Sequence, residues 1–119
     1  MQPELLSTVQ DAIALLESWR GQLVTVHAML ARGTGDEWEY DRHHCTHTRL
    51  SLVIEHVGCR FSGAALMVLG TLDGQQCEYE VSLDALVAVR RTDESSIAFK
   101  ERFGQAAERV SVIRLGESQ

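Results

Sequence analysis

The sequence lacks the features that mark a secreted, membrane-anchored or repetitive protein. It has a single proline and no tract rich in serine and glycine that would indicate a linker. Its longest apolar runs, near residues 64–69 and 86–89, are far too short for a helix that spans a bilayer, which needs about 20 apolar residues. The first residues lack the basic and apolar regions of a signal peptide. We therefore expect a protein without a membrane segment that stays in the cytoplasm.

Cysteine is also scarce, and the spacing of the cysteines does not match a disulfide framework. Cys45, Cys59 and Cys77 are odd in number and include no C-x-x-C pair. This excludes a disulfide framework and a zinc ribbon, both of which need paired cysteines at short spacing. Reduced thiols in a reducing compartment are the expectation.

No catalytic motif of fixed spacing is present. The sequence contains no G-x-S-x-G, H-E-x-x-H or P-loop, and the glycines at 33 and 35 lack the third glycine and the following helix of a dinucleotide-binding turn. The net charge of −6 disfavours binding to a phosphate backbone. The sequence therefore favours a binding protein that is not an enzyme and does not bind nucleic acid.

What is present is the pattern of one folded domain. The chain has 119 residues, 45% of them hydrophobic and 24% charged, which suits a single core and a polar surface. Apolar residues recur at helical spacing over residues 1–20, with a proline near the start and Gly21 just past the end, so we predict a helix there. Because an apolar helical stripe must cover something, we expect it to pack on a sheet or plug a barrel.

Beyond Gly21 the period changes to an alternation of apolar and polar residues, which predicts strands. The pair Asp73-Gly74 suits a tight hairpin turn between residues 65–72 and 75–83. Within the second of these strands we expect Cys77 and Tyr79 to point inward. Residues 96–110 fit either a strand or a helix capped by a serine, and the strand is favoured because residues 86–91 need a neighbour.

The predicted fold class is α+β. An N-terminal helix precedes an antiparallel meander of about six strands over residues 21–115, which forms a small barrel or a strongly bent sheet. No internal repeat or domain boundary is visible, so residues 1–119 are predicted to be one domain.

A histidine cluster is the most unusual feature of the chain. Residues 41–47 hold three of the five histidines and one cysteine. If this segment continues the strand that follows it, His43, Cys45 and His47 share the face opposite the core. Two imidazoles and a thiolate are ligands that suit Zn²⁺ or a copper ion. The alternative is a polar edge strand whose histidines are incidental.

Three aromatic residues define a second candidate site. Trp38, Tyr40 and Tyr79 fit a ligand pocket inside a barrel, or ordinary core packing. Three functions follow from these patterns. The first is a non-catalytic module that recognises a protein partner or self-associates, and it is favoured. The alternatives are a transition-metal-binding protein and an enzyme for a small ligand.

Overall fold

The computed structural model describes residues 3–32, 38, 45–60 and 64–116. These residues form one helix and seven strands, all of the strands in a single antiparallel sheet. The elements are α1 (Pro3–Ser18), β1 (Leu23–Arg32), β2 (Cys45–Arg60), β3 (Ala65–Leu72), β4 (Gln75–Ser82), β5 (Leu86–Asp93), β6 (Ser96–Phe103) and β7 (Ala107–Leu115). The predicted α+β class is confirmed.

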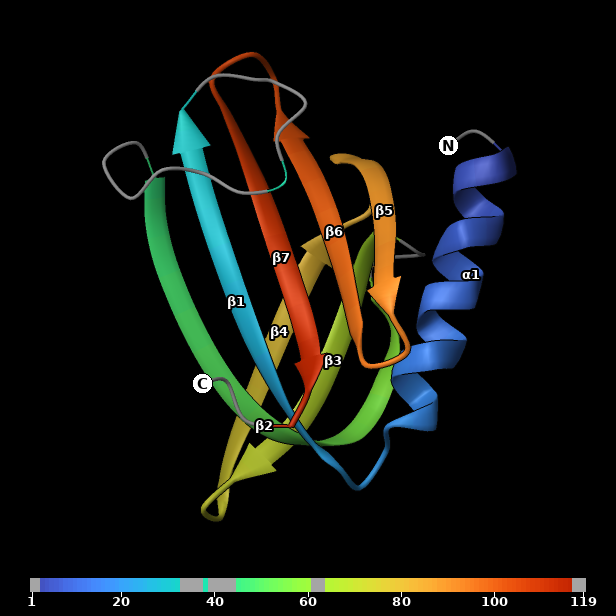
Figure 1. Ribbon diagram of the computed structural model, residues 1–119, viewed down its shortest axis with the longest axis vertical. Coiled ribbons are helices and arrows are strands. Elements are labelled where there is room, and N and C mark those ends of the chain that lie inside the picture. Colours follow the sequence, from blue (N-terminus) through green and yellow to red (C-terminus); the bar gives the residue numbers. More distant parts are fainter. Residues whose placement is uncertain (1–2, 33–37, 39–44, 61–63, 117–119) are drawn as a thin grey trace.

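The strand order is β4-β3-β2-β1-β7-β6-β5. Strands β1 to β4 form one run of antiparallel neighbours and β5 to β7 form a second run. The two runs join where the last strand, β7, pairs with the first, β1. In Figure 1, β3 and β4 lie behind the layer of β1, β7 and β6, and β2 bends between the two layers. The meander is therefore interrupted once, between β4 and β5, which follow each other in the chain but lie at opposite edges of the sheet.

The predicted barrel or strongly bent sheet is wrong. The sheet is open and twisted, with β4 and β5 as its edges, and it has seven strands where about six were expected. Closure would require β4 to pair with β5 or β6, and the described residues show no such pairing. Helix α1 contacts both β2 and β5, so it fills the space on the open side of the sheet.

Helix α1 forms where the apolar spacing predicts it. Pro3 occupies its first turn, where the missing amide hydrogen costs nothing, and Gly21 follows its end with a φ of 81°. The buried face presents Val9, Ala12 and Leu16 to the sheet. No helix among the described residues is long and apolar enough to cross a membrane.

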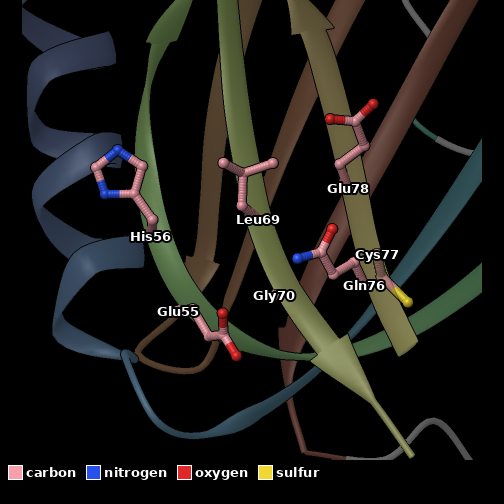
Figure 2. Close-up of a pocket in the computed structure, with 7 residues that line it drawn as sticks. All are labelled: Glu55, His56, Leu69, Gly70, Gln76, Cys77 and Glu78. Atoms are coloured by element: carbon pink, nitrogen blue, oxygen red, sulfur yellow. The ribbon is translucent and has the colours of Figure 1, made fainter. Parts of the chain in front are cut away.

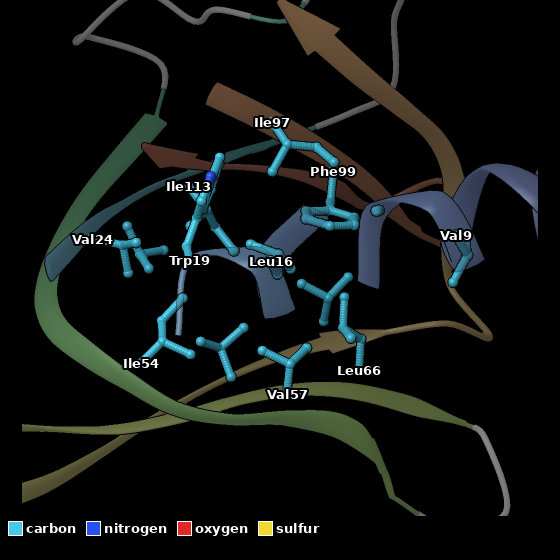
Figure 3. Packing of buried hydrophobic residues seen from close by; sticks show 14 of the residues in the cluster. Val9, Leu16, Trp19, Val24, Ile54, Val57, Leu66, Ile97, Phe99 and Ile113 are labelled. Atoms are coloured by element: carbon cyan, nitrogen blue, oxygen red, sulfur yellow. The ribbon is translucent and has the colours of Figure 1, made fainter. Parts of the chain in front are cut away.

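The main core lies between α1 and the inner face of the sheet (Figure 3). Alternate residues of the strands supply one side of it, as the period of two requires. The helix supplies the other side. Leu16 of α1 and Phe99 of β6 are completely buried in this core. Figure 3 labels Val9, Leu16, Trp19, Val24, Ile54, Val57, Leu66, Ile97, Phe99 and Ile113. The expected cover for the apolar helical stripe is therefore the sheet itself.

Residues 96–110 form β6, a turn and the start of β7, so the strand prediction is confirmed and the helical alternative is wrong. Strands β6 and β7 pair along their length and meet at a turn that contains Gly104. The φ of Gly104 is 63°, a left-handed conformation that glycine adopts without strain. The same glycine would have weakened a helix, which explains why the turn falls there.

Candidate functional site

The face of the sheet opposite α1 carries the cluster that the sequence singles out. Cys45 and His47 are alternate residues of β2 and point to this outer face, as predicted. Cys45 packs against a small second cluster made of Met29, Ala98 and Val110. His43 lies outside the described residues.

Strand β1 adds a third side chain to this cluster. His27 lies opposite Arg49 in the β1–β2 register, and His47 lies opposite Met29, so the two histidines are diagonal neighbours. Their rings stack with centroids 5.0 Å apart, and Nε2 of His27 is 2.7 Å from Nδ1 of His47. On its other side, Nε2 of His47 is 3.1 Å from Sγ of Cys45. The three side chains form a linear chain of hydrogen bonds.

This geometry differs from that of a metal site. His47 offers one ring nitrogen to Cys45 and the other to His27, so a single ion cannot bind all three residues in the observed arrangement. No group of three or more His, Cys, Asp or Glu side chains among the described residues is arranged to hold a metal ion. Binding of Zn²⁺ or copper through His43, Cys45 and His47 stays a prediction, because His43 is not described.

The electrostatic surroundings keep one of the imidazoles neutral. Burial lowers the pKa of His27 below its ordinary value of 6.5, and the positive charges of Arg49, His47 and Arg114 lower it further. A neutral imidazole has one nitrogen free to accept a hydrogen bond. His27 is therefore suited to accept a hydrogen bond from Nδ1–H of His47.

The predicted aromatic pocket is not assembled as expected. Trp38 packs against the outer cluster, with the cationic groups of Arg90 and Lys100 each 5.8 Å from its ring centroid. Tyr79 packs against the main core on the inner face, as its predicted inward orientation requires. The two rings belong to clusters on opposite faces of the sheet, so the structure does not bring them into one pocket. Tyr40 lies outside the described residues.

Tyr79 instead borders a groove at the free edge of β4. The groove has a volume of ≈ 550 Å³ and extends from β4 to β6 and β7. The guanidinium of Arg109 lies 5.4 Å from the centroid of the Tyr79 ring and 6.0 Å from that of Phe103. The groove is lined by Ala64, Ala65, Glu78, Tyr79, Glu80, Ser82, Asp84, Glu101, Phe103 and Arg109.

Tyr79 is held at the edge of the core by its hydroxyl group, which hydrogen-bonds the hydroxyl of Ser111 on β7. Burial raises the pKa of Tyr79, although the bond to Ser111 and the nearby charge of Arg109 oppose this effect. The phenol therefore stays neutral at physiological pH. Its ring forms a fixed wall of the groove.

A second hollow, of ≈ 470 Å³, lies where β2 passes β3 and β4 (Figure 2). A register shift between Ile54 and His56 bends β2 at this point. Figure 2 shows the His56 ring and the Cys77 sulfur on opposite sides of the hollow, pointing away from each other. Because its polar groups do not converge, this hollow offers no arrangement for acid–base or nucleophilic chemistry.

Sequence reasoning missed His27, Arg109 and Phe103. The alternation of β1 assigns His27 to the outer face, but nothing in the sequence gives the register that places it beside His47. Arg109 and Phe103 fall in the region whose helix-or-strand assignment was open. The available signal was that His27 and His47 both fall on the outer-facing positions of two strands that are consecutive in the chain, and consecutive strands often pair.

Comparison with known proteins adds no relative: no family model, no curated protein and no solved structure matches the chain.

Proposed function

We propose that the protein is a small, non-catalytic interaction module that binds a protein partner through the β4–β6 groove. The observation that carries this proposal is the stack of Tyr79, Arg109 and Phe103 along the groove. Arginine and aromatic residues dominate the binding energy of protein interfaces, because they combine large contact area with polar or cationic character. Phe103 is 40% exposed and is available to a partner.

Arg109, at the centre of the stack, is held in place before any partner binds. Nε of Arg109 is 2.7 Å from Oε1 of Glu101, and its Nη2 is 2.9 Å from Oε2 of the same carboxylate. Glu101 is fully buried, so this pair is fixed within the protein. A preorganised surface loses little side-chain entropy when it binds, which leaves more of the contact energy for affinity.

The charge of the groove defines the partner. Its lining carries the carboxylates of Glu78, Glu80 and Asp84 in addition to the Glu101–Arg109 pair. Arg60 contacts Glu78 and Glu80 from outside the lining. The partner segment that fits this groove best inserts an apolar side chain against Phe103 and places basic residues beside the lining carboxylates.

Pairing of a partner strand with an edge of the sheet has less support than binding in the groove. Ser82 N and Glu80 O, on the free edge of β4, already bond to Glu101 and Arg109. The other edge strand, β5, has two register irregularities and exposes Arg90 and Arg91. Charges and irregularities are the features that protect edges against adding another strand. The groove is therefore the favoured surface, and self-association through strand pairing is the weaker form of the proposal.

Photo-crosslinking tests the groove directly. A photoreactive phenylalanine analogue replaces Phe103 in one variant and Val87 in the other, since both side chains are 40% exposed. We expect a discrete adduct with one other protein from position 103 and none from position 87. The Phe103→Ser variant, still folded by circular dichroism, should then bind the purified partner at least about tenfold more weakly, a typical effect for an interface anchor. Equal adducts from both positions, or an adduct with the mass of two copies of this chain, would contradict the proposal.

We place this module in the cytoplasm, where its three cysteines would stay reduced. The described structure has all three as free thiols. A reducing compartment keeps such thiols unpaired.

A further inference from the structure

The linear chain Cys45–His47–His27 on the outer face is independent of the groove and has a chemistry of its own. Sγ of Cys45 lies 3.1 Å from Nε2 of His47, and Nδ1 of His47 lies 2.7 Å from Nε2 of His27. A thiol nucleophile is activated when a base lies within hydrogen-bonding distance of it and a third group orients that base.

The protons of the chain can be assigned without conflict. With all three groups neutral, the Cys45 thiol donates to Nε2 of His47, and Nδ1–H of His47 donates to Nε2 of His27. When the thiol proton moves to His47, the imidazolium still donates from Nδ1 to His27. His27 can accept in both states because burial and neighbouring positive charges favour its neutral form.

The charges around the cluster select the kind of reagent that approaches it. The positive charges of Arg49 and Arg114 both lower the pKa of His27, so these two side chains lie close to the Cys45–His47–His27 hydrogen-bond chain. Arg90 and Lys100 surround Trp38, which packs against the same outer cluster as Cys45. The buried carboxylate of Glu108 pairs with Lys100 on this face. The described part of the face is still basic through Arg49, Arg90 and Arg114, although the whole chain has a net charge of −6. An anionic reagent is attracted there and a cationic one is repelled.

We propose that Cys45 is a modification site that forms a mixed disulfide with a small anionic disulfide. In this step His47 takes the proton of the Cys45 thiol, and the thiolate attacks one sulfur of the incoming disulfide. The Cys45 S–S bond forms as the S–S bond of the reagent breaks. The leaving thiolate takes the proton from the His47 imidazolium. Cys45 is thereby oxidised, the reagent releases one reduced thiol, and His47 returns to its neutral form.

The three cysteines of the chain provide an internal comparison. Cys59 is exposed, and no described side chain forms a hydrogen bond with it. Cys45 and Cys77 are both partly buried. If exposure alone set the rate, Cys59 would react first. The proposal instead predicts that Cys45 reacts first.

The experiment treats the full chain with oxidised glutathione, an anionic disulfide, at neutral pH and maps each modified cysteine by mass spectrometry over time. Only a few per cent of an ordinary thiol is ionised at this pH, so full ionisation raises the rate by at most about 30-fold. His47 can take the thiol proton as the attack proceeds and so supplies part of this increase, and we expect Cys45 to react about tenfold faster than Cys59. A Cys59 rate equal to or above that of Cys45 overturns the proposal.

Three variants separate the roles within the chain. His47→Gln removes the base and should bring the Cys45 rate to within about twofold of the Cys59 rate. His27→Leu removes the acceptor that orients His47 and should slow Cys45 several-fold, whereas His27→Gln retains an acceptor oxygen and should restore most of the rate. If His27→Leu and His27→Gln slow the reaction equally, the positioning role of His27 is wrong.

The charge of the reagent provides the last comparison. Cystamine has the same S–S bond but carries positive charges. The ratio of Cys45 to Cys59 rates should fall when cystamine replaces oxidised glutathione, and Arg49→Gln should reduce the difference between the two reagents. An unchanged ratio with both reagents would overturn the choice of an anionic disulfide. The groove variant Phe103→Ser should leave every one of these rates unchanged, so the outcome is independent of the partner-binding proposal.

Discussion

The partly exposed Arg109 forms an ion pair with the fully buried Glu101, and this pair also holds the free edge of β4. Each oxygen of the Glu101 carboxylate accepts a hydrogen bond from the Arg109 guanidinium. The same two side chains reach across to β4, where Ser82 N donates to Glu101 at 2.8 Å and Arg109 donates to Glu80 O at 3.0 Å. Side chains thus satisfy the backbone groups that a neighbouring strand would bond in a closed barrel.

Removing only one member of this ion pair should destabilise the protein. Arg109→Leu leaves the Glu101 carboxylate buried without its partner, and we expect the free energy of unfolding to fall by about 3–5 kcal/mol. The double variant Arg109→Leu, Glu101→Met removes both charges and should be more stable than the single variant. Urea denaturation of the three proteins tests this. If the double variant is less stable than Arg109→Leu, the buried charge is not the source of the loss.

The pKa of His27 predicts a pH dependence of stability. Burial, followed by the charges of Arg49, His47 and Arg114, lowers this pKa in the folded state from 6.5. Well above pH 6.5 the imidazole is neutral in both states and contributes nothing. As the pH falls through 6.5, the unfolded state takes up a proton that the folded state resists, so the free energy of unfolding falls. The loss is complete once the pH is below the folded-state pKa.

Thermal or urea unfolding between pH 8 and pH 5 tests this dependence. The stability difference between the natural protein and His27→Gln should change in this range, because the glutamine does not titrate. The natural protein should lose more stability than the variant on acidification. Parallel curves for the two proteins would contradict the assignment to His27.

Helix α1 is required because it covers the inner face of the sheet. Leu16 is completely buried, and Leu16→Ala should lower the free energy of unfolding by about 2–5 kcal/mol, since it removes apolar contacts and leaves a cavity. Leu6 lies on the same helix with 47% of its surface exposed, so Leu6→Ala is the matched control. Its effect should stay within about 0.5 kcal/mol. Similar losses in both variants would indicate that the helix is not packed as described.

Gly70 is required by close packing between β3 and β2. A Cβ atom at this position would lie 2.0 Å from the carbonyl oxygen of Val53, a backbone atom that cannot move without disturbing the ladder. Gly70→Ala should therefore lower the free energy of unfolding by about 1–3 kcal/mol through overpacking. At Gly58 the nearest atom to an added Cβ is the end of the exposed His56 side chain, at 3.0 Å. Gly58→Ala should cost less, and denaturation curves of the two variants decide the order.

Local periodicity determined most of the elements and the face of each residue. The helical spacing near the start predicted α1, and alternation predicted the hairpin around Asp73-Gly74. The parity of β2 correctly placed Cys45 and His47 together on the outer face. These features could be predicted because each depends on residues that are close together in the sequence.

Only the tertiary structure decided how the two runs of strands join in one sheet. The pairing of β7 with β1 inside the sheet joins the two runs of strands, and α1 fills the side where a barrel would close. The β1–β2 register places His27 beside His47, and the approach of β4 to β6 places Arg109 between Tyr79 and Phe103. A period of two gives the face on which a side chain lies but not its partner on the next strand, because the register depends on contacts between residues far apart in the sequence.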